Sequence, residues 1–306
     1  MSIAIFGVGG AGGYFGARLI RAGHDVTFVA RGEHLRVIRE HGLTVLTDAE
    51  AFVVRPRVAS DDPAVTEEAN VVLLGVKCWQ VEDAARALAR VLGKRAVVVP
   101  LQNGVLTVDR LASHLGADRV MGGLCGTITR IDGPGRLRSV GTTHFLRFGE
   151  LDRRVRARTR RLRQAFLDAG VSAEIPKDIH VAIWQKFLFV VPVGGVGAFA
   201  DADIGTLRTA PELRSTLEAA MREIHVLGRA RGIALPDDAV QQAMTFVDGL
   251  PASGTSSLQR DLAAGRPSEL DDWTGAVVRL GRESGVPTPV HDRILAKLAP
   301  QGRPCT

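Results

Sequence analysis

Lysine is scarce in this chain, and two of its lysines stand where a proton donor could act. The sequence contains 39 lysine and arginine residues, of which only five are lysine. Lysine can release a proton when burial lowers its pKa, whereas arginine in a protein effectively cannot. Lys77 follows an apolar run typical of a buried strand, and Lys186 lies in an apolar segment between Trp184 and Phe187. Lys186 therefore has the properties of a general acid, although its place in a helix equally fits a side chain that lies along apolar surface.

A glycine-rich loop near the start of the chain predicts a dinucleotide phosphate site. It matches the pattern G-x-G-x-x-G, follows an expected strand and opens an expected helix. The loop consists of Gly7, Val8, Gly9, Gly10, Ala11 and Gly12. Gly7 permits the tight turn, Gly9 lets the backbone approach a pyrophosphate, and Gly12 allows close packing of helix on strand. The N–H groups and the dipole at the helix N-terminus then attract the phosphates.

The end of the second expected strand indicates which dinucleotide binds. Proteins that bind NAD carry Asp or Glu about 20 residues beyond the glycines, where the carboxylate contacts the ribose hydroxyls. Here the strand ends at Ala30, and Arg31 stands where the acid is expected. A guanidinium can pair with the 2′-phosphate of NADP(H), so Arg31 favours NADP(H) as the cofactor. The alternative is that Arg31 is an ordinary surface residue.

The expected elements place these residues at one edge of a parallel sheet. Strands rich in Val, Ile and Phe are predicted at 3–6, 25–30, 71–76 and 96–100, and helices at 11–22, 32–41, 80–92 and 105–115. This alternation is typical of a doubly wound, mostly parallel Rossmann-type sheet. Lys77 and Asn103 then follow neighbouring strands at the edge where open α/β sheets bind ligands. Residues 132–135, Asp-Gly-Pro-Gly, predict a hairpin between residues 120 and 150, and a short strand follows at 171–175.

The second half of the chain has helical patterns only. Beyond Pro176, helices are predicted at 178–191, 211–231, 237–247, 268–284 and 289–298. The predicted fold class is therefore α/β, with an N-terminal Rossmann-type domain followed by an all-helical C-terminal domain. We expect residues 1–176 to bind NADP and residues 177–306 to form the substrate and catalytic domain. A cleft between two such domains is a common place for a ligand.

Composition excludes several other classes of protein. Hydrophobic residues make up 45% and charged residues 24% of the 306 residues, which is typical of a globular protein. The longest strongly apolar run, 187–200, is interrupted by Pro192 and is shorter than the roughly 18 residues of a membrane helix. No basic segment precedes an apolar core near the N-terminus, so we expect no secretory signal and no membrane partner. Three scattered cysteines form no evident disulfide framework or metal site, which favours a reducing cytoplasm.

The net charge of +6 comes from one short segment. Its seven arginines are Arg153, Arg154, Arg156, Arg158, Arg160, Arg161 and Arg163. Without them the net charge would be 6 − 7 = −1. Val155, Leu162, Phe166 and Ala169 recur there at helical spacing, which predicts an amphipathic helix with a solvated arginine face. No stacking aromatic lies between the arginines, so we expect no nucleic-acid partner.

Short motifs in a fixed order resemble the ketopantoate reductase (2-dehydropantoate 2-reductase) family, within the 6-phosphogluconate-dehydrogenase-like superfamily. Besides the glycine loop and Arg31, the matching segments are Val76-Lys77-Cys78-Trp79-Gln80, Asn103-Gly104, Trp184-Gln185-Lys186, Ser256-Ser257-Leu258-Gln259-Arg260-Asp261 and Glu269. They extend over almost the whole chain. The resemblance implies NADPH-dependent reduction of 2-dehydropantoate to pantoate, as in pantothenate biosynthesis, in the cytoplasm and without a metal.

The resemblance also implies roles for individual residues. Lys186 would donate the proton to the C2 carbonyl oxygen, and Glu269 would lie beside the cofactor and help to position Lys186. Ser257, with Ser256 beside it, would hold the substrate carboxylate. Lys77 and Asn103 would contact both the cofactor and the substrate. Gln80 would contact the cofactor, and Ile128 would touch it through its backbone. An ammonium group beside the carbonyl would both stabilise the negative charge and supply the proton.

Two substrate-facing positions depart from the family pattern. The family places asparagines one and two helical turns after the lysine, where this chain has Val190 and Gly194. An apolar face cannot hydrogen-bond the hydroxymethyl group of ketopantoate, and the unpaired group costs about 1–3 kcal/mol. A reductase of another, more apolar 2-oxo acid is therefore an alternative. A non-catalytic NADP(H)-binding sensor is another, and a dehydrogenase with a His–Asp pair ranks lowest. A homodimer is one oligomeric state that fits the sequence.

Overall fold

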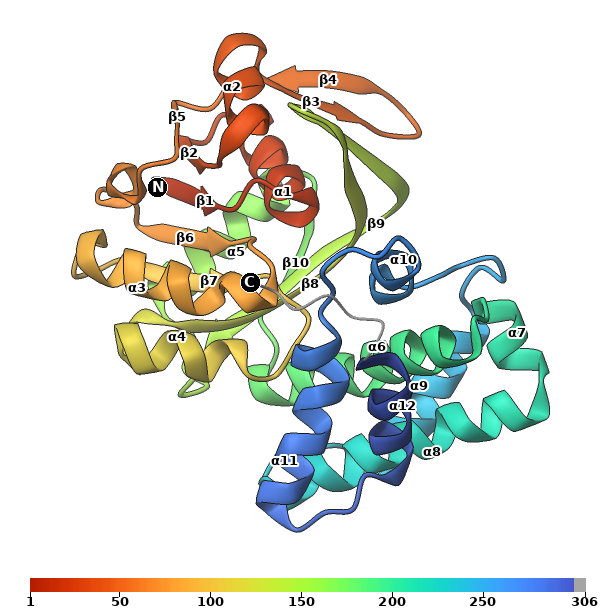
Figure 1. Ribbon diagram of the computed structural model, residues 1–306. Coiled ribbons are helices and arrows are strands. Elements are labelled where there is room, and N and C mark those ends of the chain that lie inside the picture. Colours follow the sequence, from red (N-terminus) through yellow and green to blue (C-terminus); the bar gives the residue numbers. More distant parts are fainter. Residues whose placement is uncertain (300–306) are drawn as a thin grey trace. The chain divides into compact units, whose positions relative to one another are not determined.

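The computed structural model describes residues 1–299, and its chain divides into two compact units (Figure 1). The first unit contains residues 1–102 and 107–179. The second contains residues 103–106 and the chain from His180 onward. The sequence placed its boundary at Pro176, close to His180. The sequence did not indicate that the short loop 103–106 groups with the second unit.

A five-stranded parallel sheet forms the centre of the first unit. Its strands, in spatial order, are β5 (Val58–Ser60), β2 (Val26–Val29), β1 (Ile3–Phe6), β6 (Val71–Leu74) and β7 (Val97–Pro100). The side chains of β2, β6 and β7 are buried on both faces, as in a parallel sheet that is covered on both sides. The chain moves outward from β1 to β2 and β5 and then returns to β6, so the strand order reverses between β1 and β6.

The helices of this unit follow the strands as the sequence predicted. Besides a helix in the arginine-rich segment, described below, they are α1 (Gly10–Arg21), α2 (Gly32–His41), α3 (Val81–Val91) and α4 (Thr107–Leu115), with 3₁₀ turns η1 (Pro63–Thr66), η2 (Cys78–Gln80) and η3 (Ala117–Arg119). Together with the parallel sheet and the helical second unit, they confirm the predicted fold class.

A second, mixed sheet was predicted only in part. Its strands are β3 (Leu43–Leu46), β4 (Ala51–Val54), β8 (Met121–Gly133), β9 (Arg136–Glu150) and β10 (Ser172–Glu174). The antiparallel hairpin of β8 and β9 turns at Pro134 and Gly135, where the sequence predicted it. Strands β3 and β4 of this sheet, and β5 of the parallel sheet, were not predicted. Strand β3 pairs in parallel with β9, far away in the sequence.

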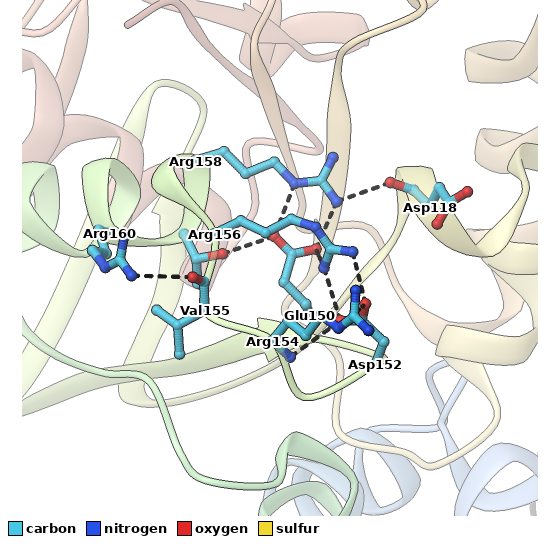
Figure 2. A network of polar contacts seen from close by, with 9 residues as sticks. Asp118, Glu150, Asp152, Arg154, Val155, Arg156, Arg158 and Arg160 are labelled. Atoms are coloured by element: carbon cyan, nitrogen blue, oxygen red, sulfur yellow. Dashed lines mark hydrogen bonds and ion pairs between the residues drawn. The ribbon is translucent and has the colours of Figure 1, made fainter.

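The arginine-rich segment contains a network of ion pairs (Figure 2). Glu150, 4% exposed, accepts hydrogen bonds from Arg158 at 2.9 and 2.6 Å and from Thr159 at 2.7 Å. Arg156 donates to both carboxylate oxygens of Asp152 and lies 3.4 Å from Glu150. These carboxylates balance part of the local positive charge. The expected absence of a nucleic-acid partner nevertheless stays a prediction.

The helix in this segment is shorter than the sequence predicted. It is α5 (Ala157–Asp168), so Val155 precedes the helix and is 45% exposed. The prediction that Val155 lies on the buried face was therefore wrong. Leu162 and Phe166 are buried as expected, and Ala169 is buried at the helix end. Arg153 and Arg156, which lie outside the helix, are held by Asp178 and Asp152 instead.

The described part of the second unit is helical, as the sequence predicted. Its helices are α6 (Ile179–Ala200), α7 (Ile204–Thr209), α8 (Pro211–Ala230), α9 (Ala239–Asp248), α10 (Ser257–Ala263), the π-helical turn η4 (Asp271–Gly275), α11 (Ala276–Ser284) and α12 (Pro289–Leu298). Residues 301–306 of the predicted domain lie outside the described residues, as does Pro300. The single helix predicted over 268–284 is thus a π-helical turn followed by α11.

Helix α6 continues through Pro192, beyond the predicted end at Val191. Proline removes one backbone hydrogen bond of a helix. The helix is apolar on all sides, and such helices are held by burial rather than by one amphipathic face. By length and composition alone α6 could cross a membrane, because an 18-residue window of it has a mean hydropathy of 1.5. However, 67% of this 18-residue window is buried inside the protein. That degree of burial is typical of the core helix of a globular protein.

Candidate active site

The glycine loop lies where the strand order reverses, between β1 and β6. Gly7 has a φ of 98°, and a Cβ atom there would lie 2.6 Å from the backbone nitrogen of Val76. A Cβ on Gly12 would overlap the carbonyl oxygen of Gly7, and one on Gly10 would overlap that of Thr129 in β8. Backbone atoms therefore require glycine at all three positions. Such switch points are where open α/β sheets bind ligands.

Gly9 differs because no packing among residues 1–299 requires it. A Cβ there would have its nearest neighbour, the carbonyl oxygen of Gly75, at an ordinary contact distance of 3.7 Å. Gly9 is also the N-cap of α1, whose N-terminus has no side-chain cap among the described residues and no acidic residue in its first turn. Backbone N–H groups at a helix end that no side chain caps suit a phosphate. The loop therefore fits the pyrophosphate of a dinucleotide.

Arg31 lies at the same edge of the sheet as the glycine loop. Strands β1 and β2 pair in parallel with Phe6 opposite Val29, and the N–H of Gly7 donates to the carbonyl oxygen of Val29 at 2.9 Å. Arg31 follows two residues later as the exposed N-cap residue of α2. Its guanidinium is therefore exposed at the edge where the loop would hold a dinucleotide.

Lys77 and Gln80 belong to the turn that follows β6. The N–H of Lys77 donates to Oε1 of Gln80 at 3.2 Å, so the Gln80 side chain helps to close the turn. The Lys77 side chain is exposed, and its Nζ lies 5.6 Å from the ring centroid of Trp79. Cys78 is 2% exposed.

Ile128 lies beside the glycine loop on β8. The β8–β9 register shifts between Gly126 and Ile128, and the next residue, Thr129, has its carbonyl oxygen against Gly10. The Ile128 residue is 64% exposed. An exposed apolar residue at this edge is consistent with a ligand contact.

Gln102 fixes this edge and was missed by the sequence reasoning. It is 7% exposed, and its Nε2 donates to the carbonyl oxygens of Leu74 at 2.9 Å and Val76 at 2.7 Å. The side chain thus ties the end of β7 to the loop that carries Lys77. Its position just after a predicted strand and directly before Asn103 could have identified Gln102 as a candidate site residue.

His34 was also missed, because the sequence reasoning placed no histidine near the motif. One ring nitrogen, Nε2, lies 2.9 Å from the carbonyl oxygen of Val8, and Nδ1 accepts a hydrogen bond from the N–H of Gly135 at 3.0 Å. Burial lowers the pKa of His34, and the hydrogen bond with Val8 opposes this shift. His34 lies one turn of α2 after Arg31, and this spacing could have identified it as a candidate site residue.

In the second unit, Lys186, Val190 and Gly194 are spaced four residues apart along α6 and therefore share one face of the helix. Lys186 and Val190 are partly buried, and Gly194 is buried. The neighbouring aromatic residues Trp184 and Phe187 pack edge to face with their ring centroids 5.8 Å apart and are nearly fully buried. They are therefore part of the core of this unit.

The end of this face lies against α10 and the π-helical turn. A Cβ on Gly194 would lie 3.1 Å from Cζ3 of Trp273, 3.4 Å from Oγ of Ser256 and 3.5 Å from Cδ2 of Leu258. Trp273 is 1% exposed, so its ring fills the space beside Gly194. Ser256 is the N-cap of α10 and accepts a hydrogen bond from the N–H of Gln259 at 3.1 Å. Its hydroxyl therefore has a structural role, whereas Ser257 begins the helix.

Glu269 lies two residues before the π-helical turn and is 8% exposed. Its carbonyl oxygen accepts from the N–H of Trp273 at 2.9 Å, which places both residues on adjoining turns. A Cβ on Gly104 would lie 4.0 Å from the carbonyl oxygen of Asp272, so the loop that carries Asn103 adjoins the same turn. π-helical turns occur frequently at functional sites, and this one was not predicted.

The predicted site residues thus form two groups, one in each unit. The glycine loop, Arg31, the Lys77–Gln80 turn and Ile128 gather at the switch point of the first unit. In the second unit, Gly194 and Ser256 lie against the turn that follows Glu269, on the helix face that also carries Lys186. Residues 1–299 contain no group of three or more His, Cys, Asp or Glu side chains that could hold a metal ion.

Two family models match the chain along most of its length. "Ketopantoate reductase PanE/ApbA" matches residues 3–153, and "Ketopantoate reductase PanE/ApbA C terminal" matches residues 178–301. A 2-dehydropantoate 2-reductase of Halobacterium salinarum is 34% identical over 303 residues, which cover 97% of both chains. A 2-dehydropantoate 2-reductase of Mesorhizobium japonicum is 30% identical over 317 residues, covering 97% of this chain and 96% of the relative.

Solved structures agree with these matches. The crystal structure of a PanE/ApbA family ketopantoate reductase from Ralstonia eutropha JMP134 has a TM-score of 0.90 at 31% identity and covers 98% of each chain. A D-mandelate dehydrogenase shares the fold with a TM-score of 0.89 at 21% identity and 98% coverage of both chains. The chain therefore belongs to the ketopantoate reductase family, whose members are NAD(P)-dependent oxidoreductases that act on a CH–OH group.

Proposed function

We propose that the chain reduces 2-dehydropantoate to pantoate with NADPH, as in pantothenate biosynthesis, and that Lys186 donates the proton. The observation that carries this proposal is the 34% identity, over 97% of the chain, to a relative named 2-dehydropantoate 2-reductase. The presence of Lys186 on a buried helix and of Glu269 beside the π-helical turn adds the residues that such a reaction needs. A non-catalytic sensor would need neither.

The chemistry assigns a task to each of these residues. When bound, the reduced nicotinamide supplies a hydride to C2 of the 2-oxo acid. The C2 oxygen gains negative charge as the hydride arrives, and the Lys186 ammonium stabilises this charge and transfers a proton from Nζ to the oxygen. Glu269 orients the ammonium, and Ser257 holds the substrate carboxylate. Lys186 is left neutral and takes up a proton from solvent before the next turnover.

The test of this mechanism is the substitution Lys186→Ala. We expect kcat to fall at least about a hundredfold, because a general acid contributes on the order of 10²–10⁴ to the rate. The dissociation constant for NADPH, measured by fluorescence, should stay unchanged. Lys177→Ala, which changes an exposed lysine, is the matched control. An effect on KM alone would assign Lys186 to substrate binding instead.

The preference for NADPH over NADH is carried by Arg31. Its exposed position at the end of β2 leaves the guanidinium available for a 2′-phosphate. We expect Arg31→Ala to weaken NADPH binding about tenfold or more while NADH binding changes little, because a charge-assisted pair is lost. Arg39→Ala is the control on the same helix, since its side chain donates to the carbonyl oxygen of Ala59. Equal losses for both cofactors would remove the argument for NADP(H).

A second candidate substrate is a more apolar 2-oxo acid. The observation that favours it is the Trp273 ring beside Gly194, which leaves no space there for an amide side chain. Comparing kcat/KM for 2-dehydropantoate and for 2-oxoisovalerate, which lacks the hydroxymethyl group, separates the two candidates. Val190→Asn should shift the ratio toward 2-dehydropantoate, and Val226→Asn, at an exposed position of α8, should not.

The remaining assignments concern location and partners. We place the enzyme in the cytoplasm, with a small 2-oxo acid and NADP(H) as its ligands. The two cysteines in the described part of the chain, Cys78 and Cys125, are both buried. Cys305 lies outside the described residues. A homodimer is one assembly that light scattering would test.

A further inference from the structure

His34 connects three segments of the first unit that are distant in the sequence. It lies on α2, 26 residues from Val8 in the glycine loop and 101 residues from Gly135 in the hairpin turn. Its Nε2 is 2.9 Å from the carbonyl oxygen of Val8, and the N–H of Gly135 donates to its Nδ1 at 3.0 Å. Both contacts are made with backbone atoms. The imidazole therefore bridges the candidate phosphate loop to the second sheet.

The partners determine the protonation state of the ring. A backbone N–H can only donate, so Nδ1 must carry a lone pair; a carbonyl oxygen can only accept, so Nε2 must carry the hydrogen. The bridge thus requires neutral imidazole in the Nε2–H tautomer. In the protonated ring Nδ1–H would face the N–H of Gly135, and that bond would be lost. Burial of the ring lowers its pKa, which favours the neutral form.

The far end of the bridge is held rigidly. Gly135 has a φ of 65°, and a Cβ there would overlap the side chain of Val37 on α2. Its carbonyl oxygen accepts from the N–H of Thr44 in β3 at 2.9 Å. The N–H of Gly135 is therefore fixed in direction by packing against α2 and by pairing with β3. An imidazole hydrogen-bonded to it has little freedom to turn.

The other end of the bridge is the peptide between Val8 and Gly9, whose orientation depends on the hydrogen bond with His34. The peptide between Val8 and Gly9 is planar and trans, so its C=O and N–H point in opposite directions. A flip of this peptide would change ψ of Val8 and φ of Gly9, and glycine tolerates either sign of φ. A Cβ on Gly9 would make only an ordinary contact, at 3.7 Å with the carbonyl oxygen of Gly75, so the neighbourhood of Gly9 is not tightly packed.

From these contacts we infer that His34 is a positioning residue for the cofactor: by holding the carbonyl oxygen of Val8, it fixes the Gly9 N–H in the direction in which the loop presents it to the dinucleotide phosphates. This inference rests on the proposed role of the glycine loop. It predicts that the loop loses order, and the cofactor loses affinity, when the ring is removed or protonated.

Few charged groups on the surrounding elements compete for this ring. On its own helix, Glu33 pairs with Arg36 at 2.6 Å and Arg31 is exposed. On the hairpin, Asp132 lies 3.8 Å from Arg130 and 3.5 Å from Arg138, while Arg136 is exposed. The glycine loop, β1 and β3 contain no charged residue. Protonation of His34 is therefore governed chiefly by its burial and its two backbone partners.

The experiment compares His34→Gln and His34→Leu with the wild type. Gln carries one donor and one acceptor and does not titrate, so it can replace the neutral ring; Leu can make neither bond. NADPH and NADH dissociation constants are measured by fluorescence between pH 5.5 and 8.5, and hydrogen exchange of residues 7–13 is measured in the protein without cofactor. His41→Gln, an exposed histidine on the same helix, is the matched control.

We expect H34L to bind both cofactors about tenfold more weakly at pH 8 and to exchange the loop amides faster without cofactor. H34Q should bind within about threefold of the wild type at pH 8. Wild-type affinity should fall as the pH drops below the ordinary histidine range, and the affinity of H34Q should fall less. Because the 2′-phosphate of NADPH titrates near pH 6, the comparison of wild type with H34Q, repeated with NADH, isolates the contribution of His34.

The inference is overturned if H34L keeps the wild-type affinity and the wild-type exchange at residues 7–13, or if H34Q and wild type share one pH dependence. If H34L is unstable, H34Q still provides the test through its pH profile. Failure of the wild type to bind either dinucleotide would instead contradict the proposed function, and the exchange data on the free protein would still decide whether His34 orders the loop.

Discussion

The glycine loop of the first unit and the glycine-rich part of α6 in the second unit both bring neighbouring atoms close to the chain. In the loop, a Cβ on Gly12 or Gly10 would overlap a backbone carbonyl oxygen. In α6, a Cβ on Gly194 would meet side-chain atoms of Trp273, Ser256 and Leu258 at 3.1 to 3.5 Å. Backbone atoms in a packed sheet cannot give way, whereas side chains can shift by a few tenths of an ångström. We therefore expect a methyl group to be tolerated less well at Gly10 and Gly12 than at Gly194.

The largest expected effect tests the loop side of this comparison. Gly12→Ala should destabilise the protein by at least about 3 kcal/mol, because helix α1 must move away from the carbonyl oxygen of Gly7. Urea unfolding of the protein without cofactor measures the loss. A loss below about 1 kcal/mol would show that the loop backbone can relax, and the contrast with α6 would disappear.

A smaller effect is expected at Gly9, and on binding rather than on stability. Gly9→Ala should leave the free energy of unfolding within about 0.5 kcal/mol of the wild type, since its φ of −81° and the 3.7 Å space suit alanine. The dissociation constant for NADPH should rise about tenfold or more, because the methyl group occupies space meant for the pyrophosphate. If stability fell and binding did not, Gly9 would be a packing glycine like Gly12.

Gly194→Ala should have a still smaller effect. Alanine gains about 1 kcal/mol over glycine inside a helix, and the 3.1 Å approach of Trp273 opposes this gain. The net change in the free energy of unfolding should lie within about 1 kcal/mol of zero, measured by the same urea titration. Gly195→Ala, whose nearest neighbours would lie at 3.4 Å, is the control on the same helix. A loss as large as that of Gly12→Ala would mean that Trp273 is as immovable as backbone.

The smallest expected effect concerns pH and the anchoring of the loop. Burial lowers the pKa of both His34 and His144. In the pH range in which these histidines titrate, the folded protein therefore binds fewer protons than the unfolded chain. Their contribution to stability is then complete above the ordinary histidine pKa and is lost as the pH falls below it. Tm should drop by a few degrees at most between pH 7.5 and 5.5. H34Q should reduce this drop; an identical drop in H34Q would assign it to other groups.

Much of the first unit could be predicted from local sequence. Strand β1 and helix α2 have the predicted bounds, and the glycine loop lies between the expected strand and helix. Such elements are determined by periodicity and by glycine, whose effects act over a few residues. The order of the family's motifs then supplied Lys186 and Glu269, which lie on α6 and before the π-helical turn.

The tertiary structure decided what depends on distant partners. The pairing of β3 with β9, the continuation of α6 through Pro192 and the filling of the space at Gly194 by Trp273 leave no local signal. The bridge from His34 joins residues 26 and 101 positions away. Close packing fixes these contacts, because the free energy of each depends on atoms that only folding brings within reach.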